Sequence, residues 1–360
     1  MRSPRTWLLA VLLATTSAAP AQALKPVTVV DRLDQPWALA FLPEGRMLVT
    51  ERVGSMRIVE ADGRVGKPLA GLPPVDVTGQ CGLLDVAVDP DFARNGLVFW
   101  TFAEPGDGGN STAVARGRLD GDALVEVRTI FSQKPKVASR LHCGSRIAFG
   151  RDGTLWVGLG DRYSRKDDAQ DPANHLGKVV RIDRDGRAPA DNPKFAAAEV
   201  WSLGHRNIQG AARHPVTGEL WTIEHGPQGG DEVNAPRRGL NHGWPLVTRG
   251  RNYGTGTRIG EDGPRPGFEE PLYVWVPSIA PSGMAFLTSD RYPGWQGSLF
   301  VGALKAQALV RLTLDGRKVV GEDRLLADLD ERIRDVRQGP DGWLYLVTDG
   351  RGGRVLRLER

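Results

Sequence analysis

Short apolar segments joined in pairs by a glycine-containing turn recur along the chain. Each pair consists of an apolar segment, a polar turn and a second apolar segment, a pattern typical of β-hairpins. Six copies of this pair occur, at residues 37–52, 84–101, 146–161, 210–225, 283–303 and 334–349. Their turns contain the glycines Gly45, Gly96, Gly153, Gly218, Gly297 and Gly342.

A third strand-like segment follows each copy. These segments lie at residues 55–63, 112–121, 177–186, 231–239, 308–316 and 353–360. Three antiparallel strands repeated six times predict an all-β fold, a six-bladed β-propeller, because one such unit cannot bury both of its faces alone. Residues 25–33 form a spare strand that we expect to complete the last blade and close the ring. The alternative, two stacked β-sandwiches, does not explain six similar units in phase.

The composition agrees with this pattern. Of the 360 residues, 45 are glycine and 25 are proline, and 40% are hydrophobic. This share of turn residues favours many short strands over long helices. No apolar run of about 18 or more residues follows the N-terminus, so we expect no membrane span.

Residues 1–23 are predicted to be a secretory signal peptide. Arg2 and Arg5 give a positive start, residues 7–14 form a short apolar run, and Ala21-Gln22-Ala23 fits a small-residue cleavage site. We therefore expect export to the periplasm or the medium, with residues 24–360 forming one propeller domain. Loss of the leader lowers the net charge from +4 to +2. With no dense lysine or arginine run, we expect no nucleic-acid partner.

Polar residues that interrupt the repeat near strand ends are the candidates for chemistry. They are Gln80, His142, Asp161, Arg206, Asn207, Lys305, Arg332 and Arg334. The innermost strands of a propeller and the loops before them share one axial funnel, so these side chains can converge from different blades. Four of them are cationic and together call for an anionic ligand. The sequence contains no helical zinc motif, nucleophile elbow, phosphate loop or dinucleotide fingerprint.

The order of these motifs resembles the soluble pyrroloquinoline-quinone (PQQ) dependent glucose and aldose sugar dehydrogenases, of the glucose/sorbosone dehydrogenase group. The matching segments lie at residues 36–52, 79–92, 142–155, 160–162, 175–182, 204–210, 224–232, 241–245, 276–286, 299–305 and 332–342. They cover essentially the whole chain after the leader. The modest length and few large insertions are closer to the aldose sugar dehydrogenase branch. The resemblance implies a six-bladed propeller with PQQ and Ca²⁺ in its axial funnel.

The resemblance also implies a role for individual residues. His142 matches the catalytic base and Asp161 matches the acid beside it. Contacts with PQQ are implied for Gln80, Arg206, Asn207, Tyr253, Lys305, Arg332 and Arg334. The carbonyls of Gly226 and Pro227 match ligands of the cofactor's calcium, and Glu232 with the carbonyl of His242 matches a further calcium site. Cys81, Cys143 and His242 depart from the residues usual in the family.

These residue types suit the implied chemistry. PQQ is a tricarboxylate quinone, which Arg and Lys side chains bind well, and Ca²⁺ prefers carbonyl and carboxylate oxygens. A neutral histidine with an acid partner can remove the proton of a sugar C1 hydroxyl while hydride leaves for the quinone.

The sequence thus predicts a monomeric enzyme that oxidises aldose sugars to lactones and passes the electrons to an unidentified acceptor. Two alternatives stay open: a calcium-dependent propeller lactonase or other hydrolase, and a non-catalytic binding propeller of the same family.

The two cysteines stand next to candidate site residues. Cys81 follows Gln80 and Cys143 follows His142, so both cysteines are expected near one mouth of the propeller. A disulfide requires Cα atoms roughly 4.4–6.8 Å apart, and an exported protein meets an oxidising compartment. Two interpretations remain equal here: a disulfide between the second and third blades, or two buried free thiols.

Overall fold

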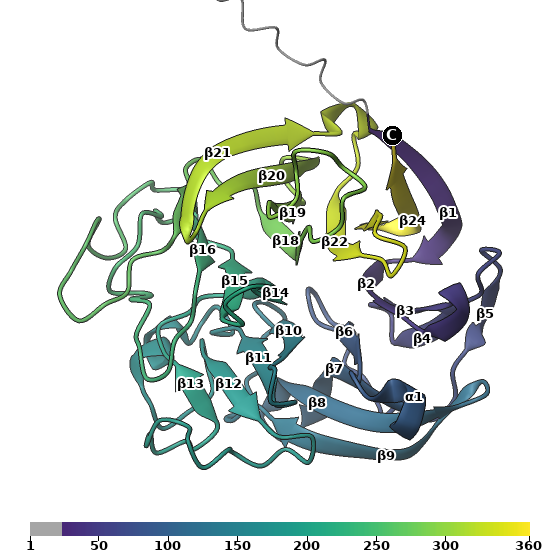
Figure 1. Ribbon diagram of the computed structural model, residues 1–360. Coiled ribbons are helices and arrows are strands. Elements are labelled where there is room, and N and C mark those ends of the chain that lie inside the picture. The colour runs from purple at the N-terminus through teal and green to yellow at the C-terminus, as the bar shows by residue number, and fades with distance from the viewer. Residues whose placement is uncertain (1–23) are drawn as a thin grey trace, which may run out of the picture.

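Six four-stranded antiparallel sheets surround a central axis in the computed structural model, which describes residues 24–360 (Figure 1). The predicted six-bladed β-propeller is confirmed. The predicted signal peptide at residues 1–23 lies outside the described residues. In the described part of the chain, no helix is both long and apolar enough to cross a membrane.

The strands of each blade follow one another outward from the axis. The first blade contains β2 (Pro36–Phe41), β3 (Met47–Glu51), β4 (Ser55–Val59) and β5 (Val65–Pro68). The second contains β6 (Leu83–Val88), β7 (Leu97–Gly106), β8 (Gly109–Asp120) and β9 (Ala123–Ser132). The third contains β10 (Gly144–Phe149), β11 (Leu155–Leu159), β12 (Val179–Ile182) and β13 (Val200–Ser202).

The remaining blades repeat the arrangement. The fourth contains β14 (Ile208–Arg213), β15 (Leu220–Glu224), β16 (Asp231–Asn234) and β17 (Tyr273–Trp275). The fifth contains β18 (Pro281–Phe286), β19 (Leu299–Ala303), β20 (Ala308–Asp315) and β21 (Lys318–Leu325). The sixth contains β22 (Ile333–Gln338), β23 (Leu344–Thr348), β24 (Arg351–Glu359) and β1 (Lys25–Asp34). The helical elements are short: α1 (Phe92–Asn95), η1 (Pro43–Gly45), η2 (Lys166–Gln170) and η3 (Ala327–Leu329).

The first strand of the described chain closes the ring. β1 pairs antiparallel with β24, with Lys25 opposite Glu359 and Asp34 opposite Arg351. In Figure 1 the purple β1 lies beside the yellow β24. This confirms that the spare N-terminal strand completes the last blade.

The number of strands per blade is a correction. The sequence pattern predicts three, and the structure has four, because the first five blades each carry an outermost strand that the pattern does not reveal. In β5 and β21 no residue is buried. Such edge strands have no alternation of buried and exposed residues to detect.

The core lies between the blades. Each of six hydrophobic clusters joins two neighbouring blades. Met56 of the first blade and Trp100 of the second are both fully buried in one cluster, as are Trp221 and Val301 of the fourth and fifth in another. Stacking around the axis therefore buries the faces that a single blade would expose.

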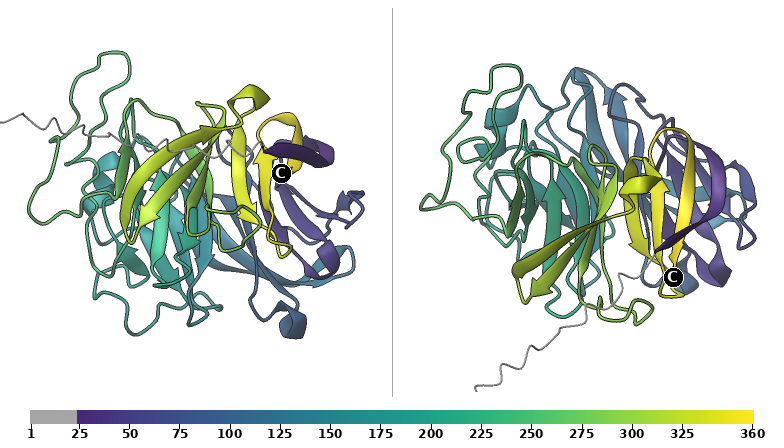
Figure 2. Two further views of the ribbon diagram at one scale, coloured as in Figure 1. Left: turned by 45° about the horizontal axis from the view of Figure 1, so that its top comes forward. Right: turned by 90° about the horizontal axis from the view of Figure 1, so that it is seen from above.

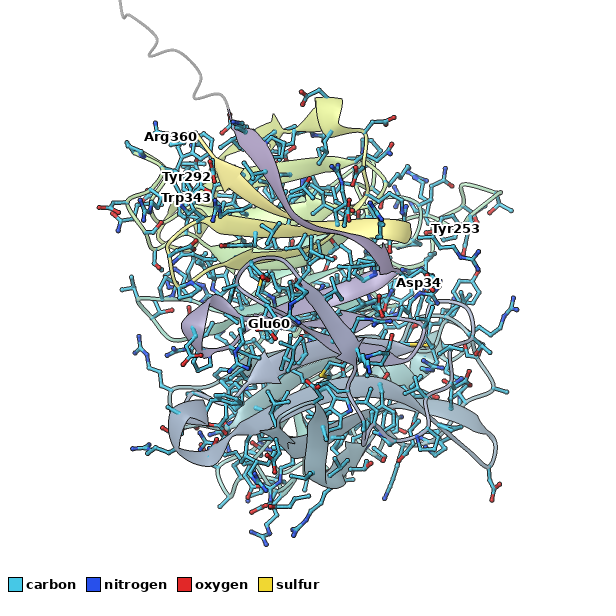
Figure 3. The ribbon with its side chains drawn as sticks, turned by 90° about the vertical axis from the view of Figure 1, so that its right-hand side faces the viewer. Asp34, Glu60, Tyr253, Tyr292, Trp343 and Arg360 are labelled. Carbon is cyan, nitrogen blue, oxygen red and sulfur yellow. A yellow bond between two sulfur atoms is a disulfide. The ribbon has the colours of Figure 1, made fainter. Side chains whose placement is uncertain are left out.

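The central axis opens at two ends of the propeller, and a buried cluster of ion pairs, which we call the ionic plug, lies between them. In Figure 3, Asp34 and Tyr253 lie at one side of the molecule, and Tyr292 and Trp343 lie at the opposite side. Between the mouths, Arg146 Nη1 lies 3.2 Å from Asp85 Oδ1 and 2.9 Å from Asp335 Oδ1. This plug ties the second, third and sixth blades together. The long segment between β16 and β17, green in Figure 2, projects beyond the blades.

Candidate active site

Two adjoining cavities lie where the innermost strands begin. The first, which we call the axial cavity, measures about 300 Å³, and the second, the His142 cavity, about 230 Å³. Cys143 lines the axial cavity, and the preceding residue, His142, lines the His142 cavity. In the same way, Asn207 lines the axial cavity and the preceding residue, Arg206, lines the His142 cavity. Residues adjacent in the chain thus form the boundary between the two cavities.

The predicted base and acid are in direct contact. His142 precedes β10 and Asp161 follows β11, and His142 Nδ1 lies 2.6 Å from Asp161 Oδ1. The backbone N–H of Tyr163 donates to the same oxygen over 2.8 Å, and Trp244 Nε1 donates to Oδ2 over 2.8 Å. The carboxylate therefore fixes the imidazole with its proton on Nδ1. Within residues 24–360, Nε2 of His142 has no hydrogen-bond partner.

The electrostatic surroundings favour a neutral imidazole beside an ionised carboxylate. Burial lowers the pKa of His142, and the charge of Arg206 lowers it further, although the bond with Asp161 acts in the opposite direction. Burial alone would raise the pKa of Asp161, but the bond and charge of His142 and the charge of Arg206 outweigh it, so this pKa is lowered. A lone pair on Nε2 is therefore available near neutral pH.

The axial cavity carries excess positive charge. Arg332 Nε lies 2.9 Å from Asp349 Oδ2, and Arg334 Nε lies 3.4 Å from Asp349 Oδ1. Two guanidinium groups thus share one carboxylate. Burial would raise the pKa of Asp349, but the charges and hydrogen bonds of the two arginines hold it below its usual value. This leaves a cation unneutralised in a concave site, which suits an anionic ligand.

Arg206 is a buried cation on the boundary of the two cavities. Its Nη1 donates to the carbonyls of His225, at 2.9 Å, and Gly226, at 2.8 Å. Its guanidinium lies 5.2 Å from the Trp244 ring. In the described part of the chain, Nε is buried without a hydrogen-bond partner. A guanidinium held by carbonyls alone can accept an anion without first breaking an ion pair.

Other predicted cofactor contacts lie around these groups. Gln80 Oε1 accepts the backbone N–H of His142 over 2.9 Å, and Asn207 Oδ1 accepts that of Gly144 over 3.2 Å. Tyr253 is 58% exposed and lines the His142 cavity. Lys305 is the exception, because its exposed side chain lines neither cavity, although the preceding Leu304 lines the axial one.

The predicted metal ligands fall into two places. The carbonyls of Gly226 and Pro227, after β15, accept hydrogen bonds from Arg206 Nη1, at 2.8 Å, and the Tyr253 hydroxyl, at 3.0 Å. Glu232 lies in a separate small cavity, which is also lined by His242, Glu269 and Glu270. Burial and the nearby charge of Glu224 raise the pKa of Glu232 to about 8. Among residues 24–360, no three His, Cys, Asp or Glu side chains form a metal-binding cluster.

Cys81 and Cys143 form a disulfide, with their Cα atoms 5.8 Å apart. The interpretation as a bridge between the second and third blades is confirmed, and the alternative of two free thiols is wrong. The bridge joins the two loops that carry Gln80 and His142.

Sequence reasoning missed several residues that line the cavities, namely Trp37, Tyr163, Lys166, Gln209, Trp244 and Asp349. Asp349 has a signal in the repeat, since it ends the sixth copy in the position that Asp161 holds in the third. Trp244 has no signal of this kind, because it lies in an irregular loop and reaches Asp161 only through the fold.

Comparison with known proteins decides the family. The profile described as Glucose / Sorbosone dehydrogenase matches residues 33–357, nearly all of the described chain. The chain belongs to the glucose/sorbosone dehydrogenase family. This confirms the family that the motifs predicted, and with it the expected class of enzyme, an oxidoreductase.

Relatives within this family are similar over most of their length. Aldose sugar dehydrogenase YliI of Escherichia coli (strain K12) is 45% identical over 339 residues, which cover 91% of this chain and 91% of that protein. The crystal structure of the apo-form of the aldose sugar dehydrogenase from Escherichia coli has a TM-score of 0.91 at 43% identity, covering 94% and 99% of the two chains. The PQQ-bound aldose sugar dehydrogenase from Streptomyces coelicolor has a TM-score of 0.78 at 33% identity, covering 95% and 99%.

Proposed function

We propose that this member of the family is a PQQ- and calcium-dependent aldose sugar dehydrogenase that oxidises sugars at C1 to the lactone. The observation that carries the proposal is the free Nε2 of His142, in a cavity that adjoins a cationic one. The PQQ-bound relative from Streptomyces coelicolor supports the choice of cofactor.

The axial cavity fits an anionic quinone. Among residues 24–360, Arg332 and Arg334 share one carboxylate and Arg206 pairs with none, so two positive charges remain for the carboxylates of a ligand. Gln80 and Asn207 line the axial cavity, and Tyr253 lines the His142 cavity. Lys305 lines neither cavity. When bound, PQQ supplies the two-electron acceptor for the hydride of the sugar.

Calcium fits the carbonyl oxygens of Gly226 and Pro227. Main-chain carbonyls are ligands that Ca²⁺ prefers, so these two oxygens would help to hold the ion, although the Gly226 carbonyl also accepts a hydrogen bond from Arg206 Nη1. We assign a further calcium to Glu232 and the carbonyl of His242, where Glu269 and Glu270 line the same small cavity.

The residues of this chain then perform the proton transfer. The sugar occupies the His142 cavity with its C1 hydroxyl toward Nε2, and His142 accepts the hydroxyl proton as hydride leaves C1. Asp161 keeps the imidazole in the required tautomer and stabilises the imidazolium that forms. Arg206 lines the His142 cavity and would stabilise negative charge that develops at the boundary of the two cavities. The proposed enzyme is exported, acts as a monomer and passes its electrons to an acceptor that is not identified.

Reconstitution tests the proposal directly. The protein is freed of metal and cofactor, and dye reduction is measured with a panel of aldoses after addition of Ca²⁺, PQQ or both. We expect sugar-dependent reduction only with both, and lost activity after thorough chelation. Lactone hydrolysis with Ca²⁺ alone would favour the calcium hydrolase, and binding of sugar without turnover would favour the non-catalytic propeller.

A PQQ titration locates the cofactor. Arg334→Ala should weaken binding by roughly 1.5–3 kcal/mol, since it removes a buried charge-assisted contact. Lys305→Ala should weaken it less, because the Lys305 side chain is exposed. Arg324→Ala is the control, since Arg324 pairs with Glu322 on the outermost strand of the fifth blade. Unchanged affinity in the Arg334 variant would remove the axial cavity from the cofactor site.

A further inference from the structure

Arg162 is a fully buried guanidinium that packs against the disulfide. Its Nη1 lies 2.7 Å from Cys143 Sγ and 3.4 Å from Cys81 Sγ. Its Nη2 donates to the carbonyl of Ser139 over 2.7 Å and to Asn110 Oδ1. Within residues 24–360 it forms no ion pair, and the charges of Asp161 and Asp76 reach it only from a distance. Buried arginines are normally paired with a carboxylate, so this arrangement needs another reason.

The contacts of Arg162 close a ring around the catalytic pair. Arg162 follows Asp161 in the chain, and Cys143 follows His142. The Nη1–Sγ contact therefore joins the two residues that flank the His142–Asp161 hydrogen bond. Cys81 extends the ring to Gln80, whose side-chain oxygen accepts the His142 N–H.

The backbone inside this ring is strained. His142, Arg162 and Tyr163 have φ values of 51°, 60° and 64°. Residues other than glycine rarely adopt this left-handed region, and they stay there only where surrounding contacts hold them. The Gln80 side chain accepts the His142 N–H and the Ser139 hydroxyl donates to the Arg162 carbonyl, while the disulfide and the guanidinium tie the loops that carry these residues together.

We propose that Arg162 and the Cys81–Cys143 disulfide form a clamp that positions the His142–Asp161 pair, with Arg162 as a positioning residue. The catalytic part of this proposal rests on the proposed function. The clamp acts in two ways: the planar fork of the guanidinium fixes geometry, and its charge adds to the positive potential at the imidazole.

The positive charge of Arg162 should affect the pKa of the His142 imidazole. Burial lowers the pKa of His142; of the charged groups, Asp161 raises this pKa, and Arg206 and Arg162 lower it. Lys166, Tyr163 and Tyr253 line the same cavity. Removal of the Arg162 charge should therefore move the pKa of His142 upward.

The first experiment uses Arg162→Met and Arg162→Lys, with the titration of the His142 imidazole followed by NMR in the cofactor-free protein. Arg162→Met should raise this pKa, whereas Arg162→Lys, which keeps the charge, should leave it near the wild-type value. Arg181→Met is the matched control. Arg181 is 6% exposed in the same blade but pairs with Asp152 and Asp191. It should cost stability and leave the pKa unchanged.

The second experiment measures kcat and KM after loading with PQQ and Ca²⁺. Both Arg162 variants should lose roughly 10- to 100-fold in kcat, because a small displacement of a reacting group has effects of this size, while KM changes little. In a Cys81→Ala/Cys143→Ala background, the loss on adding Arg162→Met should be smaller than in the wild type, since the clamp is already open.

The outcomes separate the two proposals. An unchanged His142 pKa in Arg162→Met, or a kcat loss that is equal with and without the disulfide, would overturn the clamp. A wild-type protein that takes up PQQ and Ca²⁺ but oxidises no aldose would overturn the proposed function. The NMR titration would still decide whether Arg162 acts on His142. If Arg162→Met fails to fold, the reduced kcat expected for Arg162→Lys carries the test.

Discussion

Two histidine–carboxylate pairs occupy similar positions in neighbouring blades. In the third blade, His142 precedes the innermost strand and Asp161 follows the second strand. In the fourth blade, His205 precedes β14 and Glu224 is the last residue of β15, and the two members of each pair are 19 residues apart. The Nδ1–oxygen distances are 2.6 Å and 2.9 Å, and each carboxylate accepts three hydrogen bonds.

The second imidazole nitrogen separates the two pairs. His205 Nε2 lies 2.8 Å from the Ser202 hydroxyl, and the whole side chain is buried. His142 Nε2 has no partner in the described part of the chain, and its side chain lines a cavity. Neighbouring blades thus carry two similar pairs, and access to Nε2 makes one histidine a candidate base while the other is bonded and buried.

Replacement of His142 should give the largest effect. His142→Ala removes the proton acceptor, so the rate of sugar oxidation should fall by about 10²–10⁴ while PQQ remains bound. The measurement is steady-state dye reduction together with a PQQ titration. Turnover near the wild-type value would refute the assigned role, and a large loss of stability instead would place His142 in the same class as His205.

The charge of Asp161 should appear in the pH profile. Asp161→Asn removes the group that raises the pKa of His142, so the acid limb of kcat/KM should move to lower pH. The rate at neutral pH should fall by about 10- to 100-fold, since the imidazolium loses its counter-charge. An acid limb that stays in place, or moves to higher pH, would mean that another group controls it.

Much of the architecture could be predicted because it repeats. Six hairpins in phase identify the propeller, and the unpaired N-terminal segment identifies the closing strand. The polar residues that interrupt the repeat identify part of the cavity lining, as Gln80 and Arg334 illustrate. The neighbours Gln80 and His142 indicated that both cysteines lie near one mouth, but sequence alone left a disulfide and two free thiols as equal alternatives, and the structure decides for the disulfide.

Burial at single atoms could not be predicted. Neither the free Nε2 of His142 nor the bonded Nε2 of His205 has a sequence signal, because the difference depends on Ser202 and on the shape of a cavity. The exposed position of Lys305 and the contact of Arg162 with two sulfurs also arise from how blades meet. Outermost strands such as β5 and β21 are missed for a related reason, since none of their residues is buried.

Replacement of His205 should act mainly on stability. His205→Ala removes the hydrogen-bond partner of the buried Ser202 hydroxyl and one partner of Glu224 Oε1. Each loss should lower the free energy of unfolding by about 1–3 kcal/mol. Denaturant unfolding measures the loss, and the kcat of folded protein should stay near the wild-type value. His214→Ala, in a partly exposed turn of the same blade, is the control and should cost less. A stable but inactive His205 variant would mean that the two pairs share one function.

The smallest expected effect concerns the third donor of Asp161. Trp244→Phe removes the Nε1–H that donates to Oδ2 but keeps a ring beneath the Arg206 guanidinium. Because the cavity lets water replace the lost donor, kcat should fall by only about 3- to 10-fold, less than a full charge-assisted bond is worth, with KM and PQQ affinity nearly unchanged.

Trp201→Phe is the matched control for that change. Trp201 Nε1 donates to the Pro236 carbonyl over 3.2 Å, away from both cavities. Loss of this hydrogen bond should leave kcat unchanged. Equal kinetics in the two variants would mean that His142 and the Tyr163 N–H orient Asp161 unaided. Asp161, in the pair that lines the cavity, would then need only two hydrogen-bond donors, whereas Glu224, in the buried pair, has three.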